Sequence, residues 1–249
     1  PHSWLSSEYV HVEVPAGLSY TVVDSNGNVV PSQVSLSWDT FEGKTSTVQL
    51  VWIAEKIPAM GLISFHVTGK PSTMQPQQIN KVIVPHDDFA IENDFMSFSF
   101  DQKGNFVAMK NKISGVASPL SIDINYYEAV ADNKCDGAYM FTDREDNPRP
   151  VPGSASQTAT IEHGDVFTEV RVVYDQGSHI YQRIRLYRDS ASLAISTHVG
   201  PVDVDDQIGK SVIMRLQTSI ASDSKFSVDS NGLEMTEHVR GLWKYGQLS

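Results

Sequence analysis

The sequence of 249 residues contains one cysteine, Cys135, so no disulfide can form within the chain. No stretch approaches the roughly 20 apolar residues that a membrane-spanning helix needs. Basic residues are also scarce: 19 Lys and Arg stand against 30 Asp and Glu, the formal net charge is −11, and no Lys/Arg cluster occurs. A surface of this sign repels phosphate backbones. We therefore expect neither nucleic acid nor a membrane among the partners of the chain.

The beginning of the sequence, Pro-His-Ser-Trp, lacks an initiator methionine, a basic n-region and an apolar h-region. No Asn-x-Ser/Thr sequon occurs either. The remaining composition is typical of a folded globular protein, with 40% apolar and 20% charged residues. We expect an excised or processed part of a longer polypeptide, in which 249 residues form one large all-β domain or two smaller ones.

Alternation of apolar and polar residues with a period of two dominates the first part of the sequence and predicts strands. The pattern allows about five to seven short strands, with the clearest at residues 10–14, 20–23 and 48–53. Residues 24–27, Asp-Ser-Asn-Gly, have the composition of a hairpin turn. Residues 1–70 are therefore predicted to form a small β-sandwich domain.

Residues 71–78 are polar, include two prolines and show no periodicity, which predicts a linker. Residues 79–249 return to alternation with longer strands, expected at 95–100, 105–110, 168–174, 180–187, 193–199 and 211–220. No segment has a sustained helical periodicity. We predict an all-β fold in which a large antiparallel sheet assembly follows the small sandwich.

Two short segments stand out as carriers of chemistry. Residues 136–141 read Asp-Gly-Ala-Tyr-Met-Phe, where two small residues let the backbone approach another surface and Tyr139 offers one hydroxyl. From the residues alone, the simplest interpretation is a strand end with a tyrosine in the core. Residues 229–235 read Asp-Ser-Asn-Gly-Leu-Glu-Met, and their first four letters repeat residues 24–27. That repeat favours a hairpin turn in which Asn-Gly supplies the positive φ values.

Both segments, in this order and spacing, resemble fixed points of the C-terminal half of family 38 glycoside hydrolases, the lysosomal and Golgi type α-mannosidases. Val-Gly-Pro-Val at 199–202 and Gly-Lys-Ser-Val-Ile-Met-Arg at 209–215 add to the resemblance, which extends from about residue 91 to 244 and more faintly over the first 70. Some positions depart from the family: Asp136 replaces a serine, and residues 238–240, His-Val-Arg, replace a run of three arginines.

The resemblance implies a large antiparallel supersandwich of the galactose-mutarotase-like kind over residues 79–249, truncated at its end. It also implies that the chain is the non-catalytic β-domain portion of a zinc-dependent retaining α-mannosidase, contributing a wall of the active site. In the family the aspartate nucleophile and the zinc ligands lie in an N-terminal catalytic domain, so we expect no catalytic residue, metal or cofactor in this chain and no activity of the chain alone. Tyr139 would contact the substrate, and Arg240 would do so further out.

The partners implied are that N-terminal domain and an α-mannoside glycan, and the family's usual compartment is the lysosome, the vacuole or the secretory route. The residues leave alternatives open. His86-Asp87-Asp88 could hold a metal but equally forms a solvated turn, and pairs such as Asp205-Asp206 are commonplace among 30 acidic residues. A stand-alone carbohydrate-binding or structural β-sandwich module is the alternative function, with an aromatic platform drawn from Trp4, Trp38, Trp52 and Trp243.

Overall fold

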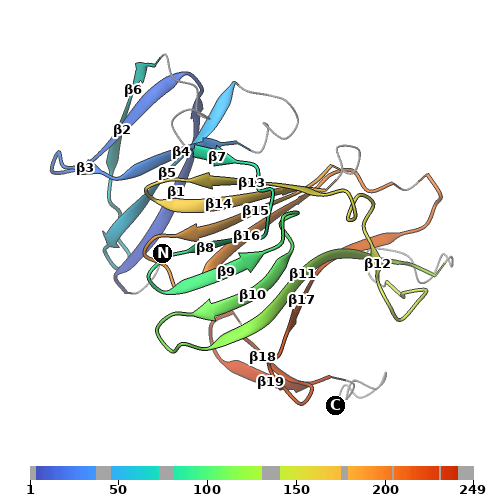
Figure 1. Cartoon of the computed structure of the whole chain (residues 1–249). Coiled ribbons are helices and arrows are strands. Elements are labelled where there is room, and N and C mark those ends of the chain that lie inside the picture. The colour runs from blue at the N-terminus through green and yellow to red at the C-terminus, as the bar shows by residue number, and fades with distance from the viewer. Residues whose placement is uncertain are drawn as a thin grey trace. The chain divides into compact units, whose positions relative to one another are not determined.

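The computed structural model describes residues 4–37, 46–72, 81–130, 141–174, 179–203, 205–229 and 231–240. Every helix or strand in these ranges is a β-strand, which confirms the all-β prediction (Figure 1). Among the described residues there is accordingly no helix that could cross a membrane. The chain forms two compact units, Pro1–Gln217 and Thr218–Ser249.

The first part of the larger unit is a small sandwich, in which the described residues form six strands in two sheets. The sheets have the orders β1-β5-β4 and β3-β2-β6, from β1 (Ser6–Pro15), β2 (Leu18–Asp24), β3 (Val29–Val30), β4 (Ser32–Leu36), β5 (Thr47–Ile57) and β6 (Phe65–Pro71). Each apolar alternation places one side of a strand between the sheets. The resulting core includes Val22, Leu50 and Trp52, all nearly inaccessible to solvent.

The predicted linker begins inside a strand. β6 continues to Pro71, which pairs with Leu18 of β2, so the first residue of the predicted linker still belongs to the sheet. Pro71 fits there because β6 pairs with β2 alone and ends at this residue, where a missing backbone N–H costs little. The rest of the predicted linker, from residue 73 onward, lies outside the described residues.

Two larger sheets follow in the same unit. One has the order β16-β15-β14-β13-β7, from β7 (Lys81–Ile83), β13 (Thr158–His163), β14 (Phe167–Val173), β15 (Ile180–Tyr187) and β16 (Leu193–Val199). The other has the order β12-β11-β10-β9-β8, with β17 also pairing with β11, from β8 (Phe89–Glu92), β9 (Met96–Phe100), β10 (Phe106–Asn111), β11 (Ala117–Glu128), β12 (Arg149–Pro150) and β17 (Lys210–Thr218). Their facing sides enclose the main apolar core, which includes Phe100, Ile122, Val170 and Ile184.

A third interface, between the β1-β5-β4 sheet and the β16-β15-β14-β13-β7 sheet, is polar as well as buried. Gln33 of β4 accepts hydrogen bonds from the backbone N–H groups of Val166 (3.1 Å) and Phe167 (3.0 Å). The side chain of Arg183 in β15 donates to the backbone oxygen of Leu36 at 2.7 Å. These contacts join the small sandwich to the larger sheets through directional bonds, which an apolar contact does not supply.

The smaller unit contains the hairpin β18 (Lys225–Asp229) and β19 (Met235–Val239). Asn231 and Gly232 both have positive φ, at 51° and 71°, and the N–H of Gly232 donates to the Asp229 carboxylate at 3.0 Å. The prediction of a hairpin turn in which Asn-Gly supplies the positive φ values is therefore confirmed, and the Asp229 carboxylate caps that turn.

Candidate active-site wall

Tyr139 lies outside the described residues, together with the rest of residues 131–140. The two flanks of this segment are described, and they pair with each other. The N–H of Val130 donates to the oxygen of Thr142 at 2.9 Å, and the N–H of Arg144 donates to the oxygen of Glu128 at 2.8 Å. An antiparallel bridge joins Ala129 and Asp143 between these bonds. The residues on either side of this segment, 128–130 and 142–144, therefore lie side by side at the end of β11.

The segment at 209–215, which also resembles the family, lies beside the end of β11. The N–H of Ala129 donates to the oxygen of Gly209 at 2.9 Å, so the Gly-Lys stretch at the start of β17 lies beside the end of β11. The structure thus places the start of β17 beside residue 129, although the two lie 80 residues apart in the sequence.

A cleft of about 540 Å³ opens beside this junction. Its lining includes Tyr126 and Glu128 of β11, Lys210 of β17 and the Val-Gly-Pro-Val stretch at 199–202. Ligand sites in proteins commonly enclose about 300 to 1,000 Å³, so the cleft is large enough for a sugar unit. Apolar walls with a few charged groups are the usual composition of such a site.

The glycine of the Val-Gly-Pro-Val stretch is explained by close packing. A Cβ atom at position 200 would lie 2.2 Å from Cβ of His179. The N–H of Gly200 also donates to the oxygen of His179 at 2.8 Å, which holds the two backbones together. Only glycine leaves room for this approach, which fixes one wall of the cleft.

Glu128 organises one side of the cleft. Its side chain is only 11% exposed, and it forms ion pairs with Arg149 at 2.9 Å and Arg144 at 4.0 Å. Arg149 also binds Glu145 at 2.6 Å, and this hydrogen bond lowers the pKa of Glu145. The arginines therefore hold the returning segment 141–150 against the end of β11.

Lys210 organises the other side. Its ammonium group is 2.7 Å from the Asp206 carboxylate and donates to the backbone oxygen of Asp203 at 2.8 Å. Hydrogen bonding to Asp206 raises the pKa of Lys210, and the same contact lowers the pKa of Asp206. Glu128 and Asp206, both in the cleft, are thus each held in an ion pair with a neighbouring cation.

The other predicted contact, Arg240, follows β19 in the smaller unit. Its side chain is exposed, and its backbone N–H donates to the oxygen of Ser224 at 2.8 Å. The position of Arg240 in the substrate site stays a prediction.

The alternative metal site is also described. His86, Asp87 and Asp88 are exposed and form the bend that precedes β8. Within the described ranges, no group of three His, Cys, Asp or Glu side chains is arranged to hold a metal ion. The exposure of these three residues is that expected of a solvated turn.

The alternative aromatic platform can be checked for two of its four tryptophans. Trp52 is 4% exposed inside the small sandwich and Trp4 is 61% exposed, so the two do not form a joint platform. Trp38 and Trp243 lie outside the described residues.

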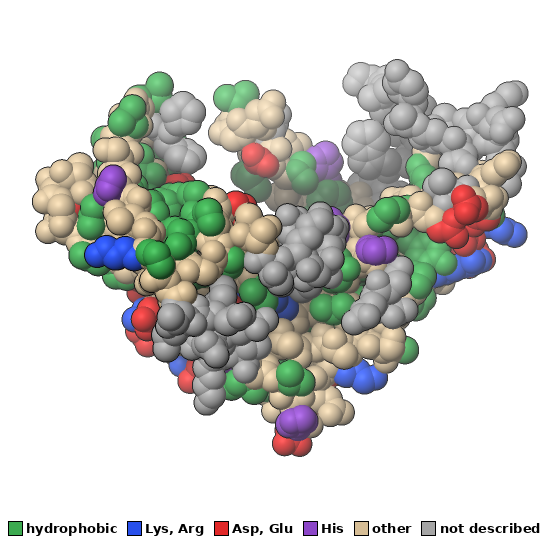
Figure 2. All heavy atoms as spheres, turned by 90° about the horizontal axis from the view of Figure 1, so that it is seen from above, with side chains coloured by type: hydrophobic (Ala, Val, Ile, Leu, Met, Phe, Trp, Pro, Cys, Tyr) green, Lys and Arg blue, Asp and Glu red, His purple; other side chains and the backbone are tan. Residues whose placement is uncertain are grey.

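On the face seen in Figure 2, the described Lys and Arg side chains form small separate groups and no large basic patch.

Three residues of the site, Glu128, Arg149 and Lys210, were not predicted as such from the sequence. Glu128 ends a strand that was not predicted, and Arg149 belongs to the two-residue strand β12, which was not predicted either. Lys210 belongs to the family-like stretch, but its ion pair with Asp206 four residues earlier depends on the turn between them. An i,i+4 pair of opposite charge outside a helix has no sequence pattern that predicts it.

Comparison with known proteins identifies the family. Residues 91–241 match the family described as "Glycosyl hydrolases family 38 C-terminal domain". Over 96% of this chain the lysosomal alpha-mannosidase of Homo sapiens is 29% identical, and this chain covers 24% of that protein. The lysosomal alpha-mannosidase of Dictyostelium discoideum is 26% identical over 95% of this chain, which covers 25% of it. The chain thus spans about a quarter of the length of these relatives.

A solved structure of a glycosyl hydrolase family 38 protein from Enterococcus faecalis has the same fold, with a TM-score of 0.51 and 14% sequence identity. The likeness covers 96% of this chain and 34% of that one. The family match extends over more than half of the chain and includes both segments that the sequence analysis singled out. The chain therefore belongs to the glycosyl hydrolase family 38 C-terminal domain family, that of the α-mannosidases.

Proposed function

We propose that this chain is the β-domain portion of a zinc-dependent, retaining α-mannosidase and forms one wall of its active site. The observation that carries the proposal is the family match over residues 91–241, which contains the segment with Tyr139. The geometry at its flanks supports it, since that segment begins and ends beside a cleft of sugar size. Lysosomal relatives support a lysosomal compartment, with the vacuole or the secretory route as the alternatives.

The chemistry would be completed by another part of the polypeptide. Retaining glycosidases need two carboxyl groups about 5–5.5 Å apart, one as nucleophile and one as acid/base. In the cleft described here, Glu128 is bound to Arg149 and Asp206 to Lys210, which suits them to bracing the walls. The relatives are about four times as long as this chain, which leaves room in them for a further domain. We therefore assign the nucleophile and the metal ligands to an N-terminal catalytic domain that would dock against this wall.

The role of this chain would be to position hydrogen-bonding groups. The phenol of Tyr139 can donate one hydrogen bond and accept others, which suits a contact to a sugar hydroxyl or to a carboxylate beside it. Backbone bonds at 128–130 and 142–144 and the ion pairs of Glu128 hold the flanks of the segment. A site held in this way keeps its geometry during catalysis. Arg240 would add a charged contact to hydroxyls further from the scissile bond.

Tyr139→Phe in the longer enzyme tests the proposal. Loss of one hydrogen bond to a charged or developing-charge group costs about 1.5–3 kcal/mol, so kcat/KM for a chromogenic α-mannoside should fall by about 10- to 150-fold while the melting temperature stays unchanged. Tyr20→Phe is the matched control, because it removes a hydroxyl that donates to the oxygen of Pro15 in the small sandwich. Its effect on kcat/KM should be negligible.

The purified 249-residue chain is the second arm of this test, and it should show no turnover of the same substrate. Turnover by the chain alone above background would contradict the assignment of the nucleophile to another domain. An unchanged kcat/KM in Tyr139→Phe would remove Tyr139 from the substrate site.

A further inference from the structure

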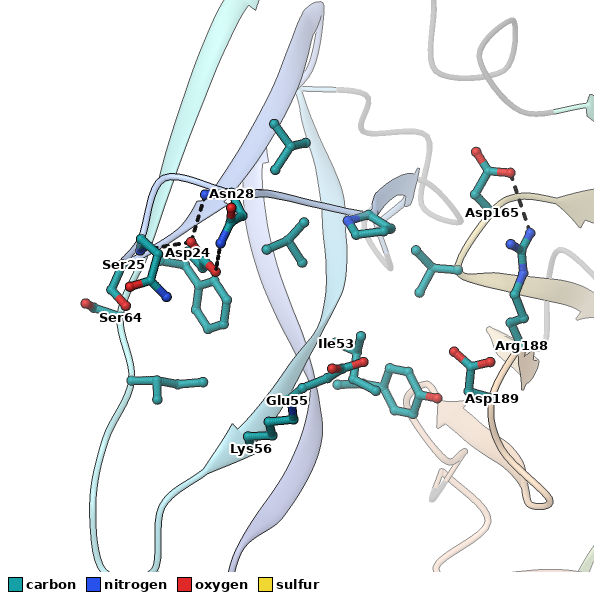
Figure 3. Close-up of a pocket in the computed structure, with 18 residues that line it drawn as sticks. Asp24, Ser25, Asn28, Ile53, Glu55, Lys56, Ser64, Asp165, Arg188 and Asp189 are labelled. Atoms are coloured by element: carbon teal, nitrogen blue, oxygen red, sulfur yellow. Dashed lines mark hydrogen bonds and ion pairs between the residues drawn. The ribbon is translucent and has the colours of Figure 1, made fainter.

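A second cavity, separate from the cleft beside β11, lies between the small sandwich and the β16-β15-β14-β13-β7 sheet (Figure 3). It has a volume of about 550 Å³ and shares no lining residue with that cleft. One wall consists of the turn after β2 and the end of β5, with Asp24 and Glu55. The opposite wall comes from residues just before β14 and just after β15, with Asp165 and Asp189. We call this cavity the inter-sheet groove.

The floor of the inter-sheet groove is apolar. Ile53, Phe65 and Val166 line it together with Tyr9. The ring of Tyr9 stacks on Tyr187 with 3.7 Å between the ring centroids and 16° between their planes. This stack ties the floor to the larger sheet, so an apolar side chain entering the groove would meet a formed surface.

The rim of the groove is held by local bonds. The Asp24 carboxylate accepts hydrogen bonds from the backbone N–H groups of Asn26 (2.9 Å) and Asn28 (2.8 Å) and from the side-chain amide of Asn28 (2.9 Å). Figure 3 shows these bonds closing the turn around Asp24. A rim that is already ordered loses little conformational entropy when a ligand binds.

The charges around the groove are unbalanced. Four carboxylates stand against the cations of Lys56 and Arg188, and they come from Asp24, Glu55, Asp165 and Asp189. Arg188 is paired with Asp165 at 3.6 Å, as the dashed line in Figure 3 shows. Within the described part of the chain, no ion-pair partner is found for Glu55 or Asp189, which come from opposite walls.

We propose that the inter-sheet groove binds a basic segment of a protein partner, with Lys or Arg side chains at Glu55 and Asp189 and an apolar side chain on the floor of Tyr9, Ile53 and Phe65. Charge complementarity selects this occupant. Nucleic acid would be repelled, whereas a cationic side chain gains an ion pair at each of the two carboxylates, which a neutral ligand cannot form. The site is distinct from the proposed mannoside site and does not depend on it.

Isothermal titration of the chain with the peptide acetyl-Lys-Phe-Lys-Leu-Lys-amide tests the proposal. The double variant Glu55→Gln/Asp189→Asn should weaken binding by about tenfold or more, because two lysine side chains of the peptide lose the carboxylates that they pair with. Both residues are exposed, so the melting temperature should not change. Asp87→Asn/Asp88→Asn is the matched control: it removes two exposed carboxylates from the bend before β8 and should change binding less than about twofold.

Three outcomes would overturn the proposal. The peptide could fail to bind the chain in low salt. The control variant could weaken binding as much as the groove variant, which would show attraction to the net charge alone. An α-linked mannotriose could bind in a way that Glu55→Gln/Asp189→Asn abolishes while the peptide does not, which would make the groove a glycan site.

Discussion

The two faces of β15 lie in opposite environments although both are buried. Ile184 faces the main apolar core and is 0% exposed, while Arg183 faces the small sandwich and is 3% exposed. The same alternation continues with Leu186 on the first face and Arg185 on the second. Burial and apolar character are therefore separate properties in this chain. We call the buried charged side chains between the small sandwich and β14–β15 the polar layer.

The polar layer is centred on Glu169 of β14, which is 0% exposed. Its carboxylate binds the guanidinium groups of Arg171, Arg183 and Arg185. Burial acts to raise the pKa of Glu169, but the three arginines outweigh burial and lower it. A buried carboxylate among cations remains charged.

The two layers differ in what they specify. An apolar core tolerates small shifts because dispersion forces have no direction, whereas each hydrogen bond of the polar layer requires one partner at one place. The small sandwich supplies such partners from β4 and β5, including Ser35, which accepts from Arg171 at 2.9 Å, and Gln49, which accepts from Arg183 at 3.3 Å. We infer that the polar layer fixes how the small sandwich sits on the larger sheet, and the apolar core holds the larger sheets together.

Glu169→Gln should have the largest effect. The substitution leaves three buried guanidinium groups without their shared counter-charge, and breaking a buried ion pair in this way costs about 3–5 kcal/mol of unfolding free energy. Urea denaturation measures the change. Glu237→Gln is the matched control, since Glu237 pairs with Lys225 while more than half exposed, and it should change stability by less than about 1 kcal/mol. Equal effects of the two variants would mean that the polar layer adds no specific stability.

Ile184→Ala tests the other face of the same strand and should have the second largest effect. Ile184 is fully buried in the main apolar core, so truncation to alanine removes apolar contacts and leaves a cavity. The expected cost is about 3 kcal/mol of unfolding free energy, within the usual range of about 2–5 kcal/mol for such changes. Urea denaturation at low and high salt measures it, and the loss should not depend on salt.

Ile113→Ala is the control for this variant, because Ile113 is 74% exposed and its truncation removes few contacts. It should change stability by less than about 0.5 kcal/mol. A loss in Ile184→Ala larger than that in Glu169→Gln would reverse the ranking of the two layers.

Much of the fold follows from strand periodicity. The predicted strands at 180–187 and 193–199 coincide with β15 and β16, because apolar side chains alternate with polar ones there. β11 was not predicted, although Leu120, Ile122 and Ile124 alternate within it. Pro119 near its start weakens a strand pattern, since proline cannot donate to a ladder. β12 has two residues and no pattern of its own.

The polar layer could not be predicted in the same way. Arg183 and Arg185 alternate with apolar residues, which is also the pattern of a strand with one face in water. Only the small sandwich, formed by a part of the chain far away in the sequence, converts that face into a buried one. The cleft beside β11 could likewise be predicted only in part. The motif at 136–141 was found by resemblance, whereas the ion pairs of Glu128 and Lys210 depend on the fold and have no sequence pattern.

The smallest effect is expected from His11→Gln, at the solvent edge of the polar layer. His11 accepts a hydrogen bond on Nδ1 from Arg185 at 3.1 Å, and its Nε2 is 3.2 Å from the hydroxyl of Tyr187. Partial burial and the charge of Arg185 lower the pKa of His11, although nearby Gln49 and Glu169 act in the opposite direction. The folded protein therefore holds this histidine neutral more strongly than the unfolded chain does.

The sign of the pH dependence follows from this difference between the two states. Because the unfolded state has the higher pKa, the contribution of His11 is fully present above about pH 6.5 and is lost as the pH falls through the lowered folded-state value. Glu169 has a lowered pKa too, so its contribution is present above the ordinary glutamate range and is lost only at more acidic pH. The two groups therefore act in separate pH ranges.

His11→Gln keeps a hydrogen-bonding side chain but cannot titrate. It should therefore flatten the fall in unfolding free energy between about pH 7.5 and 5.5, which urea denaturation at several pH values measures. His66→Gln in β6 is the reference variant, because it removes an exposed histidine by the same substitution, and the slope of His11→Gln is compared with it. An unchanged slope in His11→Gln would show that the stability of the polar layer does not depend on pH through this residue. The two faces of β15 would then differ in their hydrogen bonds and packing but not in pH dependence through His11.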